Sequence, residues 1–383
     1  MKVKRVLAAL LAAVLLLGCV PFTAGAAKKA HVPTELYVGE KNKTEHNLIE
    51  RFANSNGPVK VIAIKTSTQS YYELTKEDGV GYVLTFYNDY EMSELIDSVD
   101  GYCGLYCDGD LTVRIAGDVT FDANDPKHKG ACGWIVKGTL TIEGKKTTDE
   151  GEEVPNPKLT VYGSKAKNAD DESSIGIWAD TLMLHRLAVV ASGGYSALKV
   201  NDTLVLGYAT LYANTDDDMN PNGVDMFTYS VVAKDTIMFG GFFKANGLLD
   251  VDGFYFKEVR EPKEGSKADY EFDNRVVVYR KDFNFQLDKY SERYNKSLKL
   301  FKNYNDIPEC LDVFLTCEEV GRKIAVINGN DLTMKRTGDA TVSVSVQCGS
   351  ERLVLDVADV NCYLKWYQWI PYLFDIIIHG RNG

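Results

Sequence analysis

A short apolar phrase recurs five times between residues 110 and 239, and this repeat constrains the fold more than any other feature of the chain. Each copy is Thr or Asp followed by three mostly apolar residues, and a further short stretch rich in β-branched and aromatic residues lies on either side. Gly, Asp and Asn separate the stretches, which is typical of short strands joined by turns. The copies begin at Asp110, Thr139, Thr181, Thr203 and Thr236.

Three short strands per repeat predict an all-β solenoid. No amphipathic helical segment of about a dozen residues interrupts the copies, which argues against alternating strands and helices. One coil cannot bury its own apolar side chains, whereas stacked coils pair their backbones and close a continuous core. The closest copies, at Thr181 and Thr203, are 22 residues apart, which suits one coil. We therefore predict a right-handed parallel β-helix with an N-terminal cap over residues 33–280.

Three polar insertions lengthen the repeat and are expected to form loops. They cover residues 143–157, 163–174 and 214–225. Loops on a rigid scaffold commonly carry function, so the side of the solenoid that bears these insertions is the expected functional side.

The first residues have the pattern of an export signal. A basic start is followed by an apolar run too short to span a bilayer and then by small residues at a cleavage site, which predicts a signal peptide over residues 1–26 and a secreted protein. The alternative is lipidation of Cys19, because residues 16–19 (LLGC) are similar to a lipobox. The basic residues, the apolar run and the cleavage site are Lys2, Lys4, Arg5, residues 6–17 and residues 24–26.

The charge of the chain disfavours nucleic acid as a partner. Its net charge is −11, from 43 basic and 54 acidic residues. Removal of the signal peptide would take away three basic residues and no acidic ones, which lowers the net charge to −14. Such a protein lacks the basic surface that phosphate backbones require.

The repeat phrase is absent after residue 274, and residues 281–362 read as a different module. Residues 331–344 alternate around a Gly turn, as paired strands do, and residues 352–357 form another candidate strand. This segment resembles the last half of a bacterial Ig-like domain of group 2, which implies a small, degenerate Ig-like β-sandwich. Residues 290–304 are expected to form either a short helix or a basic loop.

The tail at residues 363–383 is the most apolar part of the chain outside the signal segment. Its Trp366 and Trp369 favour contact with a membrane surface or cell envelope, because Trp prefers the interface between lipid and water. The competing interpretation is a strand or helix that docks onto the preceding module.

Seven cysteines remain after cleavage of the signal peptide. They cluster at residues 103–132 and 310–362, and they are expected either to form disulfides within each cluster or to be buried free thiols. Cys103, Cys107, His128 and Cys132 have a spacing similar to that of zinc ligands. Cys107 falls inside a predicted strand, however, so structural cysteines are favoured over a zinc site.

The insertion at residues 214–225 contains a partial calcium motif. Its candidate ligands alternate along the chain, as in loops that wrap a hard cation with oxygen atoms. Tyr229 stands where the motif requires a bidentate Glu, so a solvated acidic turn is favoured over calcium. The candidate ligands are Asp216, Asp218, Asn220 and Asn222.

The same insertion supports the main rival function, a polysaccharide lyase or glycoside hydrolase. Residues 214–218 are similar to the acidic motifs of polygalacturonases, which are also β-helices. The acids here are contiguous, and neighbouring side chains in a strand point in different directions. No complete catalytic set is present, and a non-enzymatic protein is favoured. Reducing-sugar assays on the Asp216→Ala variant would separate the two functions.

Three aromatic residues near the coil starts are candidates for ligand binding. Trp134, Trp178 and Tyr195 would stack in neighbouring coils. If these side chains face outward, they form an aromatic ladder that binds sugar rings. If they face inward, they are core residues, and Trp is found more often in the core.

Several phrases resemble a family of secreted β-helical repeat proteins of Firmicutes, often labelled carbohydrate-binding. They are residues 34–39, 81–86, 104–113, 133–142 and 253–265. The resemblance implies a cell-surface protein that binds a polysaccharide or an envelope glycan without catalysis, and it supplies no catalytic residues. A structural stalk without a ligand is the further alternative.

Overall fold

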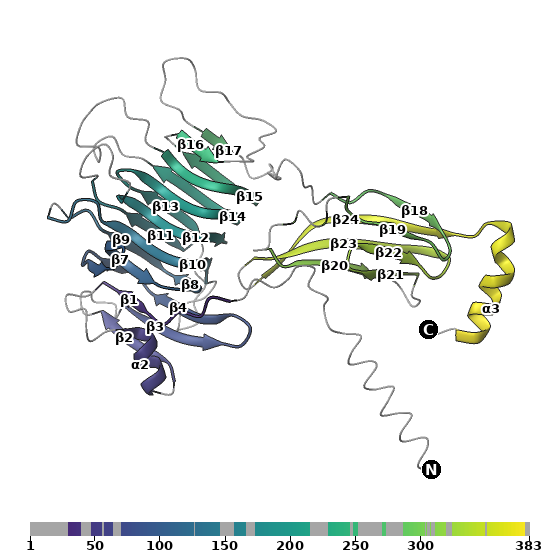
Figure 1. Ribbon diagram of the computed structural model, residues 1–383, viewed down its shortest axis with the longest axis horizontal. Coiled ribbons are helices and arrows are strands. Elements are labelled where there is room, and N and C mark those ends of the chain that lie inside the picture. Colours follow the sequence, from purple (N-terminus) through teal and green to yellow (C-terminus); the bar gives the residue numbers. More distant parts are fainter. Residues whose placement is uncertain are drawn as a thin grey trace, which may run out of the picture. The chain divides into compact units, whose positions relative to one another are not determined.

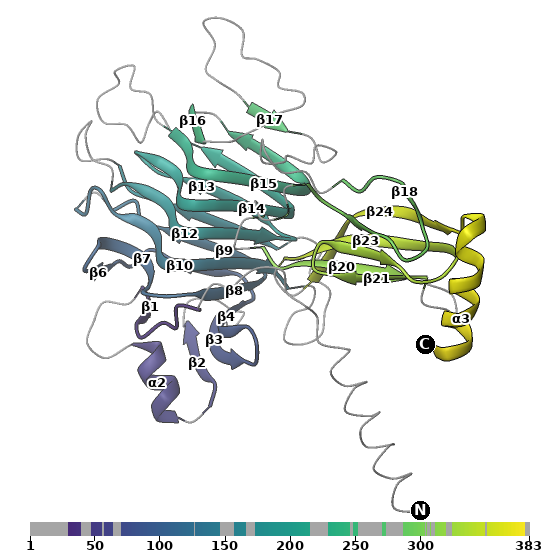
Figure 2. The ribbon, with the colours of Figure 1, turned by 45° about the vertical axis from the view of Figure 1, so that its right-hand side comes forward.

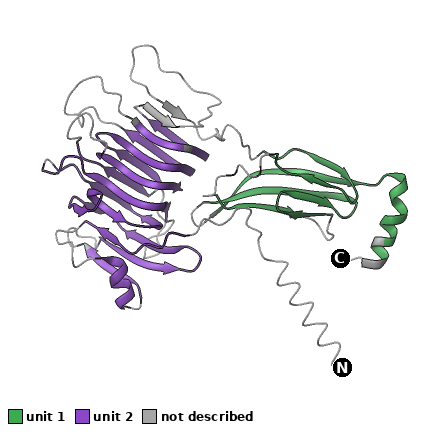
Figure 3. Cartoon of the chain, in the orientation of Figure 1, with its two compact units in different colours: residues 1–28, 283–347, 352–383 green, residues 29–282, 348–351 purple. Residues whose placement is uncertain are grey.

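The computed structural model describes two compact units, coloured separately in Figure 3. The first contains the described residues of 29–282 and 348–351, and the second contains those of 283–347 and 352–383. Both are built mainly from β-strands, as predicted. The described residues are 30–39, 47–55, 57–63, 70–125, 127–145, 157–165, 173–214, 229–245, 248–251, 270–272, 286–302, 304, 307, 311–318, 324–348 and 351–379.

The first unit is one mixed sheet of 17 strands with a short helix, α2 (Leu48–Ser55). Figure 1 shows its strands stacked one above another from β7 to β16. The strands are β1 (Leu36–Val38), β2 (Val59–Ala63), β3 (Ser70–Glu77), β4 (Gly81–Tyr87), β5 (Tyr90–Met92), β6 (Ile96–Ser98), β7 (Gly101–Cys107), β8 (Leu111–Ala116), β9 (Asp118–Asp122), β10 (Cys132–Gly144), β11 (Lys158–Tyr162), β12 (Ile175–His185), β13 (Ala188–Ser192), β14 (Ser196–Asn214), β15 (Tyr229–Ala245), β16 (Leu248–Val251) and β17 (Tyr270–Phe272).

Parallel pairing places the repeated phrases side by side. β10 pairs in parallel with β7, β8 and β12, and the parallel pairing continues through β14 to β15. Leu111, Leu140, Leu182 and Leu204 occupy matching positions and are almost completely buried. The predicted alignment of the first four phrases is confirmed, and their inward residues form a continuous apolar core.

The fifth phrase is displaced by one residue from the predicted alignment. Thr236 pairs with Leu204, whereas the repeat predicted that it would pair with Thr203. Met238 is consequently the buried core residue that lies beside Leu206. A one-residue change of register moves each side chain to the opposite face of the sheet, so the repeat predicted the wrong orientation for this copy.

Antiparallel strands complete the first unit at both ends. β2, β3 and β4 form an antiparallel group beside α2 (Figure 2), and β4 then pairs in parallel with β8. β1 and β6 pair with β7 in antiparallel fashion, as β17 does with β15. The buried Leu48 and Ile49 of α2 belong to the same core as the strands. The sheet is therefore mixed rather than uniformly parallel.

The second unit contains two sheets. One has four strands and the other has three, with a buried core that includes Leu332, Met334, Val342 and Val344. The strands are β18 (Tyr290–Arg293), β19 (Ser297–Lys299), β20 (Val313–Glu318), β21 (Ala325–Asn328), β22 (Asp331–Met334), β23 (Gly338–Cys348) and β24 (Glu351–Tyr363).

The helix considered for residues 290–304 is wrong. These residues contain β18 and β19, which are separated by a turn where Asn295 has a φ of 58°. Asn tolerates this left-handed conformation better than most residues, which explains a turn at this position.

The apolar tail is helical. A 3₁₀ turn, η3 (Trp366–Gln368), leads into α3 (Trp369–His379), which follows β24. Tyr372 on α3 is buried, with its ring 5.0 Å from the ring of Tyr294. Among the helices of the described residues, none has the length and apolar character needed to cross a membrane.

Candidate functional site

Trp134 belongs to the core and not to an outward ladder. Its side chain is fully buried, and its ring lies edge-on to Phe121 at a centroid distance of 5.1 Å. Trp134 pairs in register with Ile177, another core residue, whereas Trp178 pairs with Ile135. Trp134 and Trp178 therefore point to opposite faces of the sheet, and of the two alternatives for Trp134 the inward core position is the one observed, rather than the ligand-binding ladder.

Trp178 and Tyr195 are partly buried and lie outside the main core. They pack against a separate cluster that includes Tyr106 and Ile135, and Tyr37 packs there as well. Successive register pairs join Tyr37 to Tyr106, Tyr106 to Ile135, and Ile135 to Trp178. The sequence analysis missed Tyr37 and Tyr106. A signal for Tyr106 was present, because it follows Gly104 at the same distance at which Trp178 follows Gly176.

Two lysines lie over the indole of Trp178. The Nζ atoms of Lys137 and Lys199 are 4.2 Å and 5.2 Å from the ring centroid, within the range of cation–π attraction. Lys137 also forms an ion pair of 2.8 Å with Asp100. A sugar ring that stacked on Trp178 would have to displace these ammonium groups, so this residue is a poor platform for carbohydrate.

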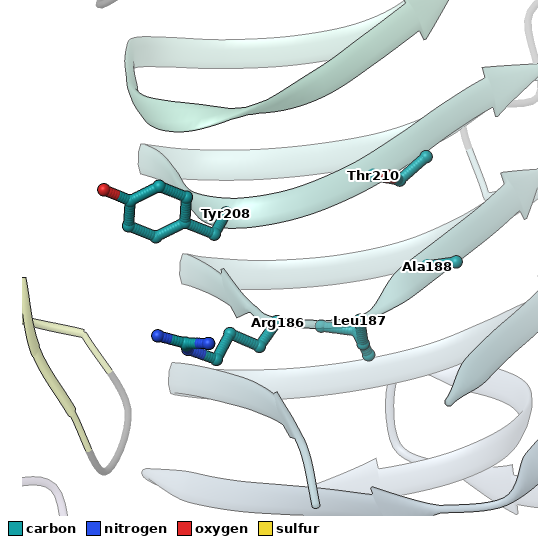
Figure 4. Close-up of a pocket in the computed structure, with 5 residues that line it drawn as sticks. All are labelled: Arg186, Leu187, Ala188, Tyr208 and Thr210. Carbon is teal, nitrogen blue, oxygen red and sulfur yellow. The ribbon is translucent and has the colours of Figure 1, made fainter. Parts of the chain in front are cut away.

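A more open site lies where the chain turns at two neighbouring places of the sheet. Arg186, directly after β12, and Tyr208, in β14, have φ angles of 51° and 52°. This left-handed conformation is uncommon for residues other than Gly, Asn and Asp. Figure 4 shows that the two side chains extend in the same direction from adjacent turns. The turns therefore place a cationic and an aromatic side chain next to each other.

These side chains border a depression of about 470 Å³, which we name the corner depression. Tyr208 is 54% exposed, and the guanidinium carbon of Arg186 is 5.9 Å from its ring centroid. The rest of the lining comes from Leu187 and from Ala188 and Thr210, which pair in register with each other. The residues that line the depression are Arg186, Leu187, Ala188, Tyr208 and Thr210.

More aromatic surface continues along β14 from the corner depression. Tyr212 lies two residues beyond Thr210, and its ring is 5.6 Å from that of Phe242 on β15. Thr210 and Phe242 are register partners, so the aromatic pair is directly beside the depression. The surface combines flat apolar rings with a guanidinium group and a hydroxyl group. Such a combination suits a ligand that has both apolar faces and many polar groups.

The candidate calcium ligands Asp216, Asp218, Asn220 and Asn222 lie outside the described residues, as do the acidic residues 216–218 of the rival enzyme motif. β14 ends at Asn214, so the strand that carries Tyr208 leads into this insertion.

The cysteines considered for zinc lie in different environments. Cys107 belongs to the main core, whereas Cys103 and Cys132 belong to the outer cluster with Tyr106. The Nδ1 atom of His128 lies 2.8 Å from Asp125 Oδ2, and its ring lies 4.3 Å from that of Tyr102. Cys132 Sγ donates to the carbonyl oxygen of Ser173. In the described part of the chain, no three candidate metal ligands form a group.

Burial makes the thiol of Cys107 unreactive. It raises the pKa of Cys107 to about 12 and that of Cys362 to about 11, so both remain protonated near neutral pH. We expect neither residue to react with a maleimide at pH 7.5 until the protein is unfolded, because the thiolate is the nucleophile. Mass spectrometry of labelled peptides checks this prediction. Complete labelling of Cys107 in the folded protein would contradict it.

Two carboxylates of the first unit are held by one arginine. Arg114 Nε donates to Glu143 Oε1 at 2.5 Å, and its two terminal nitrogens contact both oxygens of Glu77. Burial acts to lower the pKa of Arg114, but the hydrogen bonds and charges of Glu77 and Glu143 together raise it, which keeps the guanidinium charged. Glu77 and Glu143 are thus engaged in a structural ion cluster, unlike a pair of carboxylates arranged around a substrate.

Comparison with known proteins adds no relative to this description. No family model, curated protein or solved structure matches the chain.

Proposed function

We propose that this protein is a secreted or surface-attached carbohydrate-binding protein without catalytic activity, and that the corner depression is its binding site. The observation that carries the proposal is the exposed ring of Tyr208 beside Arg186 and Thr210. Sugar rings present C–H groups that pack on an aromatic face, and their hydroxyl groups accept hydrogen bonds from a guanidinium. The corner depression offers both kinds of contact.

We further propose that the stacked coils form a right-handed parallel β-helix and that the second unit is an Ig-like sandwich. The parallel register from β7 to β15 and the two small sheets support these assignments. The similarity of the repeat phrases to secreted β-helical proteins of Firmicutes supports export and glycan binding. In this proposal the solenoid holds the corner depression rigidly.

The Tyr208→Ala variant tests the binding site. We expect its affinity for the preferred polysaccharide to fall at least tenfold, or about 1.4 kcal/mol, because the sugar loses its stacking surface. The preferred polysaccharide is first identified on a glycan array with the unaltered protein. Isothermal titration calorimetry then compares the two proteins.

Tyr102→Ala is the matched control, since Tyr102 is another partly exposed tyrosine of the first unit, at 38% exposure. It should bind as the unaltered protein does. Equal affinity of the Tyr208→Ala variant would contradict the site, and a blank array would favour a structural stalk. Release of reducing ends that Asp216→Ala abolishes would instead favour the lyase or hydrolase.

A further inference from the structure

The C-terminal helix presents a continuous apolar stripe to its surroundings. Six large apolar side chains of η3 and α3 are between 49% and 85% exposed. Those on α3 follow the spacing i, i+1, i+4, i+5, i+8, which places them within an arc of roughly 140°. Burying such side chains is the dominant driving force of folding and association, so an exposed stripe of this kind indicates a contact surface. The residues are Trp366, Trp369, Ile370, Leu373, Phe374 and Ile377.

The opposite side of the helix is already attached to the second unit. Tyr372 is buried against Tyr294, and its hydroxyl lies 2.9 Å from that of Thr337. Gln368 Nε2 donates to the carbonyl oxygen of Tyr294 at 3.0 Å. Tyr372 and Gln368 both lie roughly opposite the stripe on the helical wheel. The helix is therefore fixed by one side while the stripe remains free for another partner.

The composition of the stripe fits the boundary between lipid and water. Trp is enriched at that boundary because its ring is apolar while its N–H group is polar. α3 has 11 residues, which is about 16 Å of helix and only half of a hydrocarbon core of about 30 Å. The helix is thus suited to lie along a bilayer surface rather than to cross it.

Two basic residues lie at the start of the helix, and two more lie in the part of the second unit that holds it. Lys365 directly precedes η3, and Arg293 donates to the hydroxyl of Tyr367 at 2.8 Å. Lys296 and Lys335 are exposed, and a backbone hydrogen bond from Met334 N to the carbonyl oxygen of Lys296 places Lys296 beside the residue that directly precedes Lys335. The acidic Glu292 lies 3.9 Å from Arg293 and offsets only part of this charge. We name these four basic residues the basic rim. Although the whole chain is acidic and α3 carries Asp375, the basic rim adds positive charge near the helix that complements anionic lipid headgroups.

We propose that the stripe of η3 and α3 inserts into the surface of a membrane that contains anionic phospholipid, and that the basic rim contacts its headgroups. This inference concerns the second unit and is independent of the carbohydrate site. The membrane contact would hold the protein at the cell surface while the corner depression binds its ligand.

The test uses the full chain with vesicles of phosphatidylglycerol and phosphatidylcholine, some of which carry brominated acyl chains. Bromine quenches tryptophan only at the depth of the bilayer, so quenching reports directly on Trp366 and Trp369. We expect quenching with mixed vesicles, and at least a tenfold weaker partition coefficient for the Trp366→Ala/Trp369→Ala variant. Trp134, which is buried, and Trp178, which is partly buried under Lys137 and Lys199 in the first unit, should contribute little to the signal.

Val354→Ser/Val357→Ser is the matched control, because both residues are exposed apolar positions on β24 of the same unit. This variant should bind vesicles normally. The Lys296→Glu/Lys335→Glu variant should lose most of the preference for phosphatidylglycerol while its far-UV circular dichroism remains unchanged.

Three results would overturn the proposal. One is the absence of bromine quenching in the unaltered protein, and another is partitioning that the Trp366→Ala/Trp369→Ala variant leaves unchanged. The third is a dimer, seen by sedimentation without vesicles, that the same variant dissolves, because a second copy would then be the occupant of the stripe.

Discussion

Replacement of Arg114 by Met is expected to lower the free energy of unfolding by about 3–5 kcal/mol, a typical loss when one partner of a buried ion pair is removed. The side chain of Glu143 is only 4% exposed and contacts Arg114 Nε at 2.5 Å. Without the guanidinium, its carboxylate stays buried without this compensating charge. Met fills a similar volume, so the effect reports on charge rather than on a cavity. Denaturation by urea, followed by circular dichroism, measures the loss.

A double variant separates this electrostatic effect from a general disturbance of the sheet. In Arg114→Met/Glu143→Met, both charged groups are replaced by apolar side chains, which is often close to neutral for stability. We expect this variant to recover most of the stability lost by Arg114→Met. Glu77→Gln should have a smaller effect than Arg114→Met, since Glu77 is 39% exposed and solvent screens its charge. A loss below 1 kcal/mol for Arg114→Met would show that the cluster contributes little.

The spacing of apolar residues was enough to predict most strands of the first unit. Leu111, Leu140, Leu182 and Leu204 lie at the same place in a repeated phrase, and parallel pairing brings them together. This worked because a phrase of fixed length that alternates inward and outward residues can stack on itself in only one register without exposing its apolar side. The antiparallel strands at the ends have no repeated phrase and could not be placed in this way.

Orientation was harder to predict than position. Three glycines mark which residues point into the core, which the repeat phrase does not. Gly104, Gly133 and Gly176 are each followed directly by a core residue. A Cβ atom on Gly133 would lie 2.2 Å from Val161 Cγ1, so close packing requires glycine there. Trp134 directly follows Gly133 and therefore points inward, whereas Trp178 is the second residue after Gly176 and points outward. The two tryptophans looked equivalent only because this offset of one residue was ignored.

The corner depression could not have been derived from the sequence. It depends on left-handed backbone at Arg186 and Tyr208, and neither residue type favours that conformation. At the corresponding type of turn after β4, Asn88 has a φ of 60°, which a sequence pattern would anticipate. For Arg and Tyr the pairing of the neighbouring strands imposes the conformation, which is a tertiary effect. A sequence search for an exposed aromatic site therefore selected the tryptophans and missed Tyr208.

Trp134→Ala is expected to destabilise the first unit by about 3–5 kcal/mol, which is typical of a fully buried aromatic residue. Its ring lies edge-on to Phe121, and Phe121 lies edge-on to Phe86 at 5.6 Å, so the three rings form a column in the core of the first unit. Alanine would leave a cavity that the rigid strands on either side cannot close. Thermal and urea unfolding of the variant measure the effect.

Trp134→Phe distinguishes a core role from a binding role. It keeps an aromatic ring against Phe121 and should cost clearly less stability than Trp134→Ala, because the cavity is smaller. Its affinity for polysaccharide should equal that of the unaltered protein, since Trp134 is fully buried. Trp178→Phe should likewise have little effect, because Lys137 and Lys199 already lie over the indole. If Trp134→Phe abolished binding while the fold stayed intact, Trp134 would have to contact the ligand, and the inward orientation of this residue would be wrong.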